Sequence, residues 1–441
     1  MKYLPIDSNL FVENRKRFAK NLAPNSLAVF NSNDIMPTNA DGTLPFRQNN
    51  DIFYLSGVDQ EESVLVLFPD AQNNDFKEVL FLKETSFEIA IWEGAKLSKE
   101  QAFDVSGIKT VYWLSEFEMV FNKMIAEAEN VYLNANEHLR AATEVDTRDV
   151  RFTKLMKERY PLHNYKRSAP ILHRLRAIKS DEEVKQIQTA CNITEKGLRR
   201  VLEICKPGIM EFEIQGELTG LFLKNRSRGH AYEPIIASGF DACVLHYIDN
   251  EKACKDGDML LMDFGAEYAN YASDLTRTIP VNGRFTQRQK DVYNAVLRVF
   301  RAASELLVPG TILDDYRNPP DGATGLLYHR EVGKMMEAEL IGLGLLDKTD
   351  VKNQDPNNPL YKKYFMHGTS HYLGLDVHDV GLWNCPMEAG MVFTCEPGIY
   401  IREENMGVRI ENDILITADG PKDLMANIPI EVEEIEDLMN A

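Results

Sequence analysis

The stretch Met366-His-Gly-Thr-Ser-His-Tyr-Leu-Gly-Leu-Asp-Val-His-Asp-Val-Gly381 holds three of the nine histidines in a chain of 441 residues. Imidazole is the commonest metal ligand in proteins and the main acid/base group near neutral pH. Histidines scattered over a surface or a core would not cluster in this way. The stretch therefore predicts a metal or acid/base site, and a hydrolytic metal site would also need carboxylates.

One pair of candidate carboxylates lies upstream of this stretch. Asp263 closes the apolar run Met259–Met262, and Asp274 follows a turn-like stretch rich in Gly, Ala and Asn. A hairpin would bring the two side chains together. Taken alone, an aspartate at a strand end is more often a cap or turn residue. Facing carboxylates repel each other unless a positive charge lies between them, so the case for a cation site depends on the residues that accompany the pair.

A second pair of candidate carboxylates lies downstream. Glu396 stands at the end of an apolar run that a Pro-Gly pair terminates, and we expect Val408–Thr417 to form a strand. In a strand, Arg409 and Glu411 share a face. An Arg–Glu pair on one face is usually an ordinary salt bridge when it stands alone. The accompanying carboxylates and imidazole favour a role in the site.

Four carboxylates and one imidazole together form a set of hard ligands in the order Asp263, Asp274, His371, Glu396 and Glu411. Carboxylates can bridge, so that five side chains can hold two ions about 3.5–4 Å apart with a shared water or hydroxide. Such a pair lowers the pKa of the shared water and polarises a carbonyl, as amide hydrolysis at neutral pH requires.

Length and composition predict a globular chain of about two or three domains, because 441 residues exceed what one hydrophobic core usually supports. The N-terminal part alternates short apolar runs with helical patterns, which predicts an α/β domain. We expect its elements at Ser26–Phe30, Val64–Phe68 and Val79–Leu82 (strands) and at Leu114–Ala128 (helix). The basic segment Lys166–Lys179 precedes a capping box at Ser180, which places the boundary between residues 172 and 173.

The C-terminal part, residues 173–441, is expected to be a mixed α+β domain. Its expected strands are Met259–Asp263, Val392–Glu396 and Val408–Thr417, and its expected helices are Gln289–Leu307 and Glu331–Leu340.

Charge and cysteine usage limit the classes of binding partner and the cellular compartment that we expect. The formal net charge of −19 disfavours nucleic acid and anionic membrane surfaces, both of which demand clustered Lys and Arg. The chain lacks both an N-terminal apolar signal run and a stretch of about 18 apolar residues. Its six cysteines include no C-x-x-C pair, so reduced thiols are expected. We therefore expect a cytoplasmic protein with no nucleic-acid or membrane partner.

The ordered ligands, with His-Gly-Thr-Ser-His, Asp-Val-His-Asp-Val-Gly and Glu-Pro-Gly-Ile-Tyr around them, resemble the methionine aminopeptidase/creatinase/prolidase family, and its aminopeptidase P branch most of all. The segment Arg47–Gly57 is similar to part of the N-terminal domain in aminopeptidase P and prolidase, so the resemblance covers nearly the whole chain. It implies an α+β pita-bread catalytic domain preceded by a smaller creatinase-like α/β domain, in a homo-oligomer, either a dimer or a tetramer.

The resemblance also implies a role for each site residue. The five ligands would bind two divalent ions; manganese suits an oxygen-rich set, with cobalt, iron(II) or zinc as alternatives. Glu396 would in addition act as general base, and Arg409 would neighbour the metal carboxylates as part of the catalytic group. The substrate-contacting residues would be His246 and His378, which also move protons, together with His367 and Tyr400.

The implied reaction is hydrolysis of the bond between an N-terminal residue and a following proline by a hydroxide that bridges the metals. Prolidase, which accepts only Xaa-Pro dipeptides, shares both domains and the metal site and stays open as an alternative. A non-catalytic peptide-binding protein on this fold is less favoured, because it would be expected to have lost ligands. One departure from the family is the long segment Arg317–Tyr328, whose Pro and Gly content predicts a surface loop.

Overall fold

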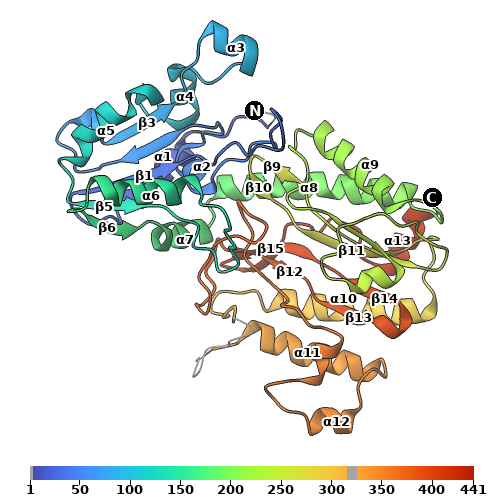
Figure 1. The fold of residues 1–441 in the computed structure, drawn as a ribbon. Helices are drawn as coiled ribbons and strands as arrows, with labels where there is room; N and C mark the ends of the chain where they lie inside the picture. Colours follow the sequence, from blue (N-terminus) through green and yellow to red (C-terminus); the bar gives the residue numbers. More distant parts are fainter. Residues whose placement is uncertain (1–2, 315–324) are drawn as a thin grey trace. The chain divides into compact units, whose positions relative to one another are not determined.

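The computed structural model describes residues 3–314 and 325–441, which form two compact units, Tyr3–Arg176 and Ala177–Ala441 (Figure 1). Helix α7 (Ala169–Ala177) runs across the boundary expected between residues 172 and 173, so the domain limits 1–172 and 173–441 stay a prediction. Most of the expected Arg317–Tyr328 loop lies outside the described residues. No helix within the described ranges is long and apolar enough to cross a membrane.

The first unit is built on a six-stranded sheet in the order β4-β3-β2-β1-β5-β6. Its strands are β1 (Ser26–Asn31), β2 (Val64–Leu67), β3 (Glu78–Leu82), β4 (Thr110–Trp113), β5 (Asn130–Leu133) and β6 (Asn164–Arg167). The sheet is mixed, because β1 is antiparallel to β2 and parallel to β5. The three expected strands are confirmed as β1, β2 and β3; their runs of β-branched and aromatic residues suit a buried pleated surface.

Helices alternate with these strands, as expected for an α/β domain. They are α1 (Asn9–Ala19), α2 (Asn50–Ser56), α3 (Phe87–Glu93), α4 (Lys99–Ser106), α5 (Phe117–Ile125), α6 (Arg148–Arg159) and α7. The helix expected at Leu114–Ala128 begins as a 3-10 turn, Leu114–Glu116, and continues as α5. The apolar face of α5 joins side chains of β1, β3 and β5 in the core of the unit.

The second unit begins with the long helix α8 (Asp181–Ile204), whose start is the expected capping box. Ser180 N–H donates to the Glu183 carboxylate and Glu183 N–H donates to the Ser180 hydroxyl. The further helices are α9 (Glu211–Lys224), α10 (Gln287–Glu305), α11 (Tyr328–Gly342), α12 (Lys348–Lys352) and α13 (Val432–Met439). The two expected helices are confirmed as α10 and α11, and α8 and α10 lie on opposite sides of the strands (Figure 1).

The strands of the second unit form small antiparallel sheets, of which β11-β8-β7 and β12-β15-β16 each have three strands. The strands are β7 (Ile235–Ser238), β8 (Met259–Phe264), β9 (Glu267–Tyr268), β10 (Tyr271–Ala272), β11 (Leu275–Pro280), β12 (Val392–Cys395), β13 (Gly398–Ile401), β14 (Met406–Arg409), β15 (Asn412–Thr417) and β16 (Gly420–Asp423). The expectation of a single strand over Val408–Thr417 is wrong. The chain changes partner at Ile410 and Glu411, because β14 pairs with β13 whereas β15 pairs with β12.

A close backbone approach brings together the two ends of the hairpin that carries Asp263 and Asp274. A Cβ added at Gly265 would lie only 1.7 Å from the carbonyl oxygen of Ser273, so that no side chain fits there. Glycine at this position lets the chain leaving β8 pass directly over the chain that enters β11.

We therefore expect Gly265→Ala to lower the free energy of unfolding of the second unit by about 1–3 kcal/mol or more, because the added methyl forces two backbone segments apart. The measurement is thermal unfolding followed by circular dichroism. Gly216→Ala is the matched control, since a Cβ at Gly216 on helix α9 meets nothing within 4 Å. That control should raise stability by up to about 1 kcal/mol. Equal stability of the two variants would contradict the prediction.

Candidate metal centre

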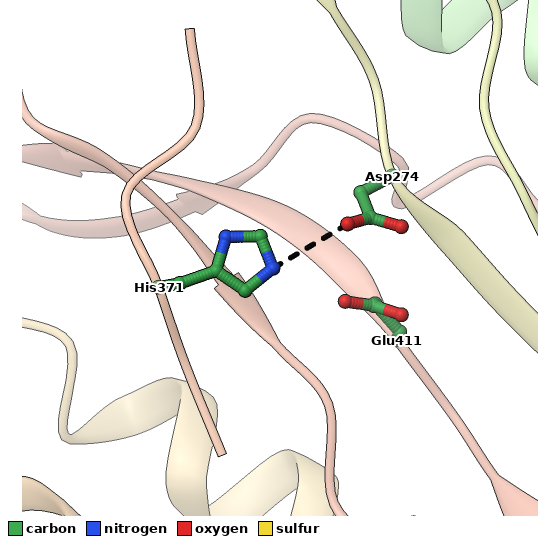
Figure 2. A group of neighbouring side chains, drawn as sticks. All are labelled: Asp274, His371 and Glu411. Carbon is green, nitrogen blue, oxygen red and sulfur yellow. Dashed lines mark ion pairs between the residues drawn. The ribbon is translucent and has the colours of Figure 1, made fainter. Parts of the chain in front are cut away.

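Three of the expected ligands form a tight buried cluster. Asp274 immediately precedes β11, His371 lies in the histidine-rich stretch, and Glu411 lies at the break between β14 and β15. One ligand atom from each residue lies within 4.8 Å of the other two (Figure 2). The Asp274 carboxylate oxygen Oδ2 lies 3.5 Å from His371 Nε2. Side chains that are far apart in sequence thus point at one another across a space that suits a cation.

The other two expected ligands adjoin this cluster. Asp263, on β8, shares a neighbour with Asp274, because the hydroxyl of Tyr232 lies within hydrogen-bond distance of Oδ1 of both carboxylates. Glu396 lies just after β12 and places its Oε1 3.6 Å from His371 Nε2. The structure therefore brings all five residues to one place.

The electrostatics of the cluster favour a cation. Burial and the neighbouring Asp263 carboxylate raise the pKa of Asp274 well above its usual range. Burial and the Asp274 carboxylate do the same to the pKa of Glu411. A divalent ion between such carboxylates reverses this effect and keeps them ionised. Four carboxylates and an imidazole are the donor chemistry that a hard or borderline divalent ion requires.

The imidazole of His371 is oriented for ligation by its own backbone surroundings. Its Nδ1 lies 3.0 Å from the carbonyl oxygen of Tyr372, which assigns the ring proton to Nδ1 and leaves the lone pair on Nε2. Nε2 is also the atom that faces Asp274 and Glu396. The hydroxyl of Thr394 accepts a hydrogen bond from the His371 N–H at 3.2 Å and fixes the main chain.

A threonine links the arginine and the glutamate that the sequence placed on one strand face. The hydroxyl of Thr276 donates to Glu411 Oε2 at 2.6 Å and accepts from Arg409 Nε at 3.1 Å. Arg409 Nη2 in turn donates to Asp263 Oδ2. Although the expected strand is broken, the Thr276 hydroxyl therefore joins Arg409 to Glu411, and Arg409 also pairs with Asp263.

His367 and Tyr400 form a neutral hydrogen-bonded pair next to Arg409. His367 Nδ1 lies 2.7 Å from the Gly368 carbonyl, so Nε2 accepts from the Tyr400 hydroxyl, also at 2.7 Å. The Tyr400 oxygen accepts from Arg409 Nη1 at 3.0 Å. Burial, helped by the Arg409 charge, lowers the pKa of His367 to about 3. Burial raises the pKa of Tyr400 to about 12. Both groups are therefore neutral near neutral pH.

The remaining expected histidines lie around this cluster. The ring of His378 stands nearly perpendicular to that of His371, with 4.3 Å between ring centroids. His246 is exposed, in a turn after the 3-10 helix Gly239–Cys243, and is close enough to His367 to help lower the pKa of that residue.

Three further residues, Tyr232, Thr276 and His329, contact the site although no sequence motif indicated them. Buried His329, on α11, accepts a hydrogen bond at Nδ1 from the N–H of Thr369, in the histidine-rich stretch, at 3.1 Å. Thr276 could have been found from the hairpin alone, because it is the cross-strand partner of Asp263 in the β8–β11 register. Tyr232 and His329 stand in unremarkable sequence, and only the fold brings them to the site.

The antiparallel strands between two long helices carry a buried carboxylate–imidazole cluster, which is the kind of site that a metal-dependent hydrolase requires. Residues 185–418 match the profile of metallopeptidase family M24, and residues 11–132 match the aminopeptidase P N-terminal domain. The chain belongs to metallopeptidase family M24. The expected class, a metal-dependent aminopeptidase with a pita-bread domain preceded by the smaller N-terminal domain, is thereby confirmed.

Several relatives cover almost the whole chain. An Xaa-Pro aminopeptidase of Haemophilus influenzae is 35% identical over 98% of this chain and 97% of its own, and that of Escherichia coli K12 is 34% identical with the same coverage. A putative aminopeptidase P from Bacillus anthracis has a TM-score of 0.88 at 32% identity. Zinc-substituted E. coli aminopeptidase P in complex with product has a TM-score of 0.85 at 33% identity. Each structural match covers 99% of both chains.

We expect Thr276→Val to weaken divalent-ion binding by about 10–100-fold, because it removes the hydroxyl that orients the Glu411 carboxylate while keeping the side-chain shape. The measurement is calorimetric titration of chelator-treated protein with manganese. Thr278→Val is the matched control on the same strand, since the Thr278 hydroxyl bonds only to the main chain of Arg409 in the described residues. If Thr276→Val binds manganese as tightly as Thr278→Val and the wild-type enzyme do, Thr276 does not orient a ligand.

Proposed function

We propose that this enzyme releases the N-terminal residue from peptides that have proline in the second position. The observation that carries the proposal is the buried cluster of Asp274, His371 and Glu411 in a chain whose full-length relatives are named Xaa-Pro aminopeptidase. A peptide-bond hydrolase needs an activated water and a polarised carbonyl, and such a cluster can hold the ions that supply both.

We propose that the five ligands Asp263, Asp274, His371, Glu396 and Glu411 hold two divalent ions, most suitably manganese. Four of the five donors are carboxylates, which favours manganese; cobalt, iron(II) and zinc are the alternatives. When bound, the ions supply Lewis-acid chemistry that polarises the scissile carbonyl and makes water nucleophilic at neutral pH.

The side chains around the ions have separate tasks in this proposal. Glu396 accepts the proton of the attacking water as general base. His378, next to His371, and exposed His246 contact the peptide and pass the proton on to the leaving amine. Neutral His367, bonded to Tyr400, lines the substrate without adding charge.

Arg409 supports this arrangement from behind the ligands. It pairs with Asp263 and donates to the hydroxyls of Thr276 and Tyr400, so one guanidinium connects the metal carboxylates with the substrate-lining pair. Its planar fork of donors reaches three separate partners at once, whereas a lysine would offer a compact point charge without this fixed geometry.

Proline is the feature of the substrate that calls for a dedicated site. The Xaa-Pro bond is a tertiary amide with no N–H, and its ring fixes φ and lowers the preference for trans. A hydrolase that orients its substrate through that N–H cannot use this bond. Carbonyl polarisation combined with histidines around the ring provides recognition without the missing donor.

We further propose a cytoplasmic homo-oligomer, a dimer or tetramer, with domains at residues 1–172 and 173–441. The cytoplasmic location is supported by the six cysteines, which are all free thiols, as in a reducing compartment.

The metal content of the enzyme tests the proposed ligand set. We expect about two divalent ions per chain at saturation, and we expect Asp274→Ala or Glu411→Ala to remove most of the activity, because each deletes a ligand. Elemental analysis, calorimetry and peptide hydrolysis are the measurements. Glu305→Ala, at an exposed position on α10, is the control and should keep both properties. Full activity of either ligand variant, or no stoichiometric metal, would reject the site.

The length of the peptides that are cleaved distinguishes this function from its main alternative, prolidase. We expect Xaa-Pro-Yaa peptides to be cleaved with higher kcat/KM than Xaa-Pro dipeptides, because an aminopeptidase lets the chain leave the site beyond the proline. The measurement is hydrolysis of peptides of increasing length under manganese, with alanine in place of proline as the control series. Cleavage of dipeptides alone would convert the assignment to prolidase, and equal cleavage of the alanine series would remove the proline specificity.

A further inference from the structure

His246 occupies a turn with little regular structure of its own. The turn follows the 3-10 helix Gly239–Cys243 and is closed by a hydrogen bond from the Tyr247 N–H to the Val244 carbonyl oxygen at 3.3 Å. The His246 side chain is exposed. An exposed imidazole in an irregular segment keeps a fixed place only when its neighbours are held by packing and hydrogen bonds from beneath.

A single buried carboxylate provides that hold. Glu211, the first residue of α9, is fully buried and accepts four hydrogen bonds. Ser238 donates to Oε1 through its N–H at 2.9 Å and its hydroxyl at 2.7 Å. The Tyr247 hydroxyl donates to Oε2 at 2.8 Å, as does the Lys252 N–H at 2.9 Å. A buried carboxylate requires such partners, and all four lie on the segment 238–252 that carries His246.

Lys252 closes this segment against the start of α9. Its carbonyl oxygen accepts the Glu211 N–H at 2.9 Å. Its ammonium pairs with Asp241, at the other end of the segment, and lies 5.7 Å from the centroid of the Tyr247 ring. Glu211 therefore binds both ends of the segment and the residue that follows His246.

Tyr247 lies between Glu211 and residues next to the candidate metal centre. Its ring belongs to a buried cluster with Ile235, Leu261 and Tyr400. The hydroxyl of Tyr400 in turn bonds to His367, as described above. The ring of Tyr247 thus shares a buried cluster with Tyr400, a proposed substrate-lining residue, while its hydroxyl is fixed by Glu211.

We propose that Glu211 is a positioning residue for His246 and that it acts through Tyr247. The carboxylate fixes the hydroxyl of the residue that closes the turn, and the closed turn sets where the imidazole meets the peptide. This inference rests on the proposed function, in which His246 contacts substrate. Glu211 itself belongs to the support of the site and touches no reacting atom.

The test uses Tyr247→Phe in the full-length manganese enzyme, because this variant removes the hydroxyl that Glu211 holds but keeps the ring in its cluster. We expect kcat for an Xaa-Pro-Yaa tripeptide to fall by roughly 10–100-fold, as for a misplaced catalytic group, with metal content unchanged. Tyr293→Phe is the matched control, since it also removes a buried tyrosine hydroxyl bond, to the Ile430 carbonyl at 2.8 Å, away from this segment. It should keep full kcat.

A double-mutant cycle distinguishes positioning from general loss of structure. In a His246→Ala background, Tyr247→Phe should cost little further activity, because the group that it positions is already gone. Full activity of Tyr247→Phe, or a loss that multiplies with that of His246→Ala, would overturn the inference while the proposed function stands. Failure of the wild-type enzyme to cleave the tripeptide, or full activity of His246→Ala, would instead overturn the role of His246 and this inference with it.

Discussion

The mutual repulsion of four carboxylates, of which Asp274 and Glu411 are buried and Asp263 and Glu396 are partly buried, is the constraint on which the second unit depends. Without compensating neighbours, these carboxylates would take up protons, or their repulsion would push the strands apart. Their neighbours offset this repulsion in different ways: the Tyr232 hydroxyl lies between two aspartates, Arg409 pairs with Asp263, and Thr276 donates to Glu411. These contacts leave the cluster with an excess of negative charge that a divalent ion neutralises, so structure and metal binding have a common cause.

Much of the site could be predicted from the sequence, because only a few residue types can serve as metal ligands. The histidine-rich stretch and the carboxylates in or beside apolar runs indicated all five proposed ligands, and the structure brings these residues together. The turn between β8 and β11 could also be predicted, since Gly, Ala and Asn between two apolar runs predict a hairpin.

What the sequence could not supply was the pairing of strands. Val408–Thr417 has the apolar pattern of a single strand, and local propensity gives no reason to break it. The break at Glu411 arises because the two halves pair with different strands, β13 and β12, which is decided by contacts distant in sequence. Tyr232 and Glu211 were missed for the same reason, since a tyrosine and a glutamate acquire their roles only from the partners that the fold assembles.

The position of Glu411 also bears on how the protein matures. Its backbone bridges to Thr276 on a hairpin made much earlier in the chain, and the cluster lacks this carboxylate until that long-range contact forms. During synthesis the two aspartates leave the ribosome close together, whereas Glu411 follows more than a hundred residues after Asp274. In the proposed two-ion site, the full ligand set would therefore exist only after this long-range contact has formed, so that metal binding would report folding of this part of the second unit.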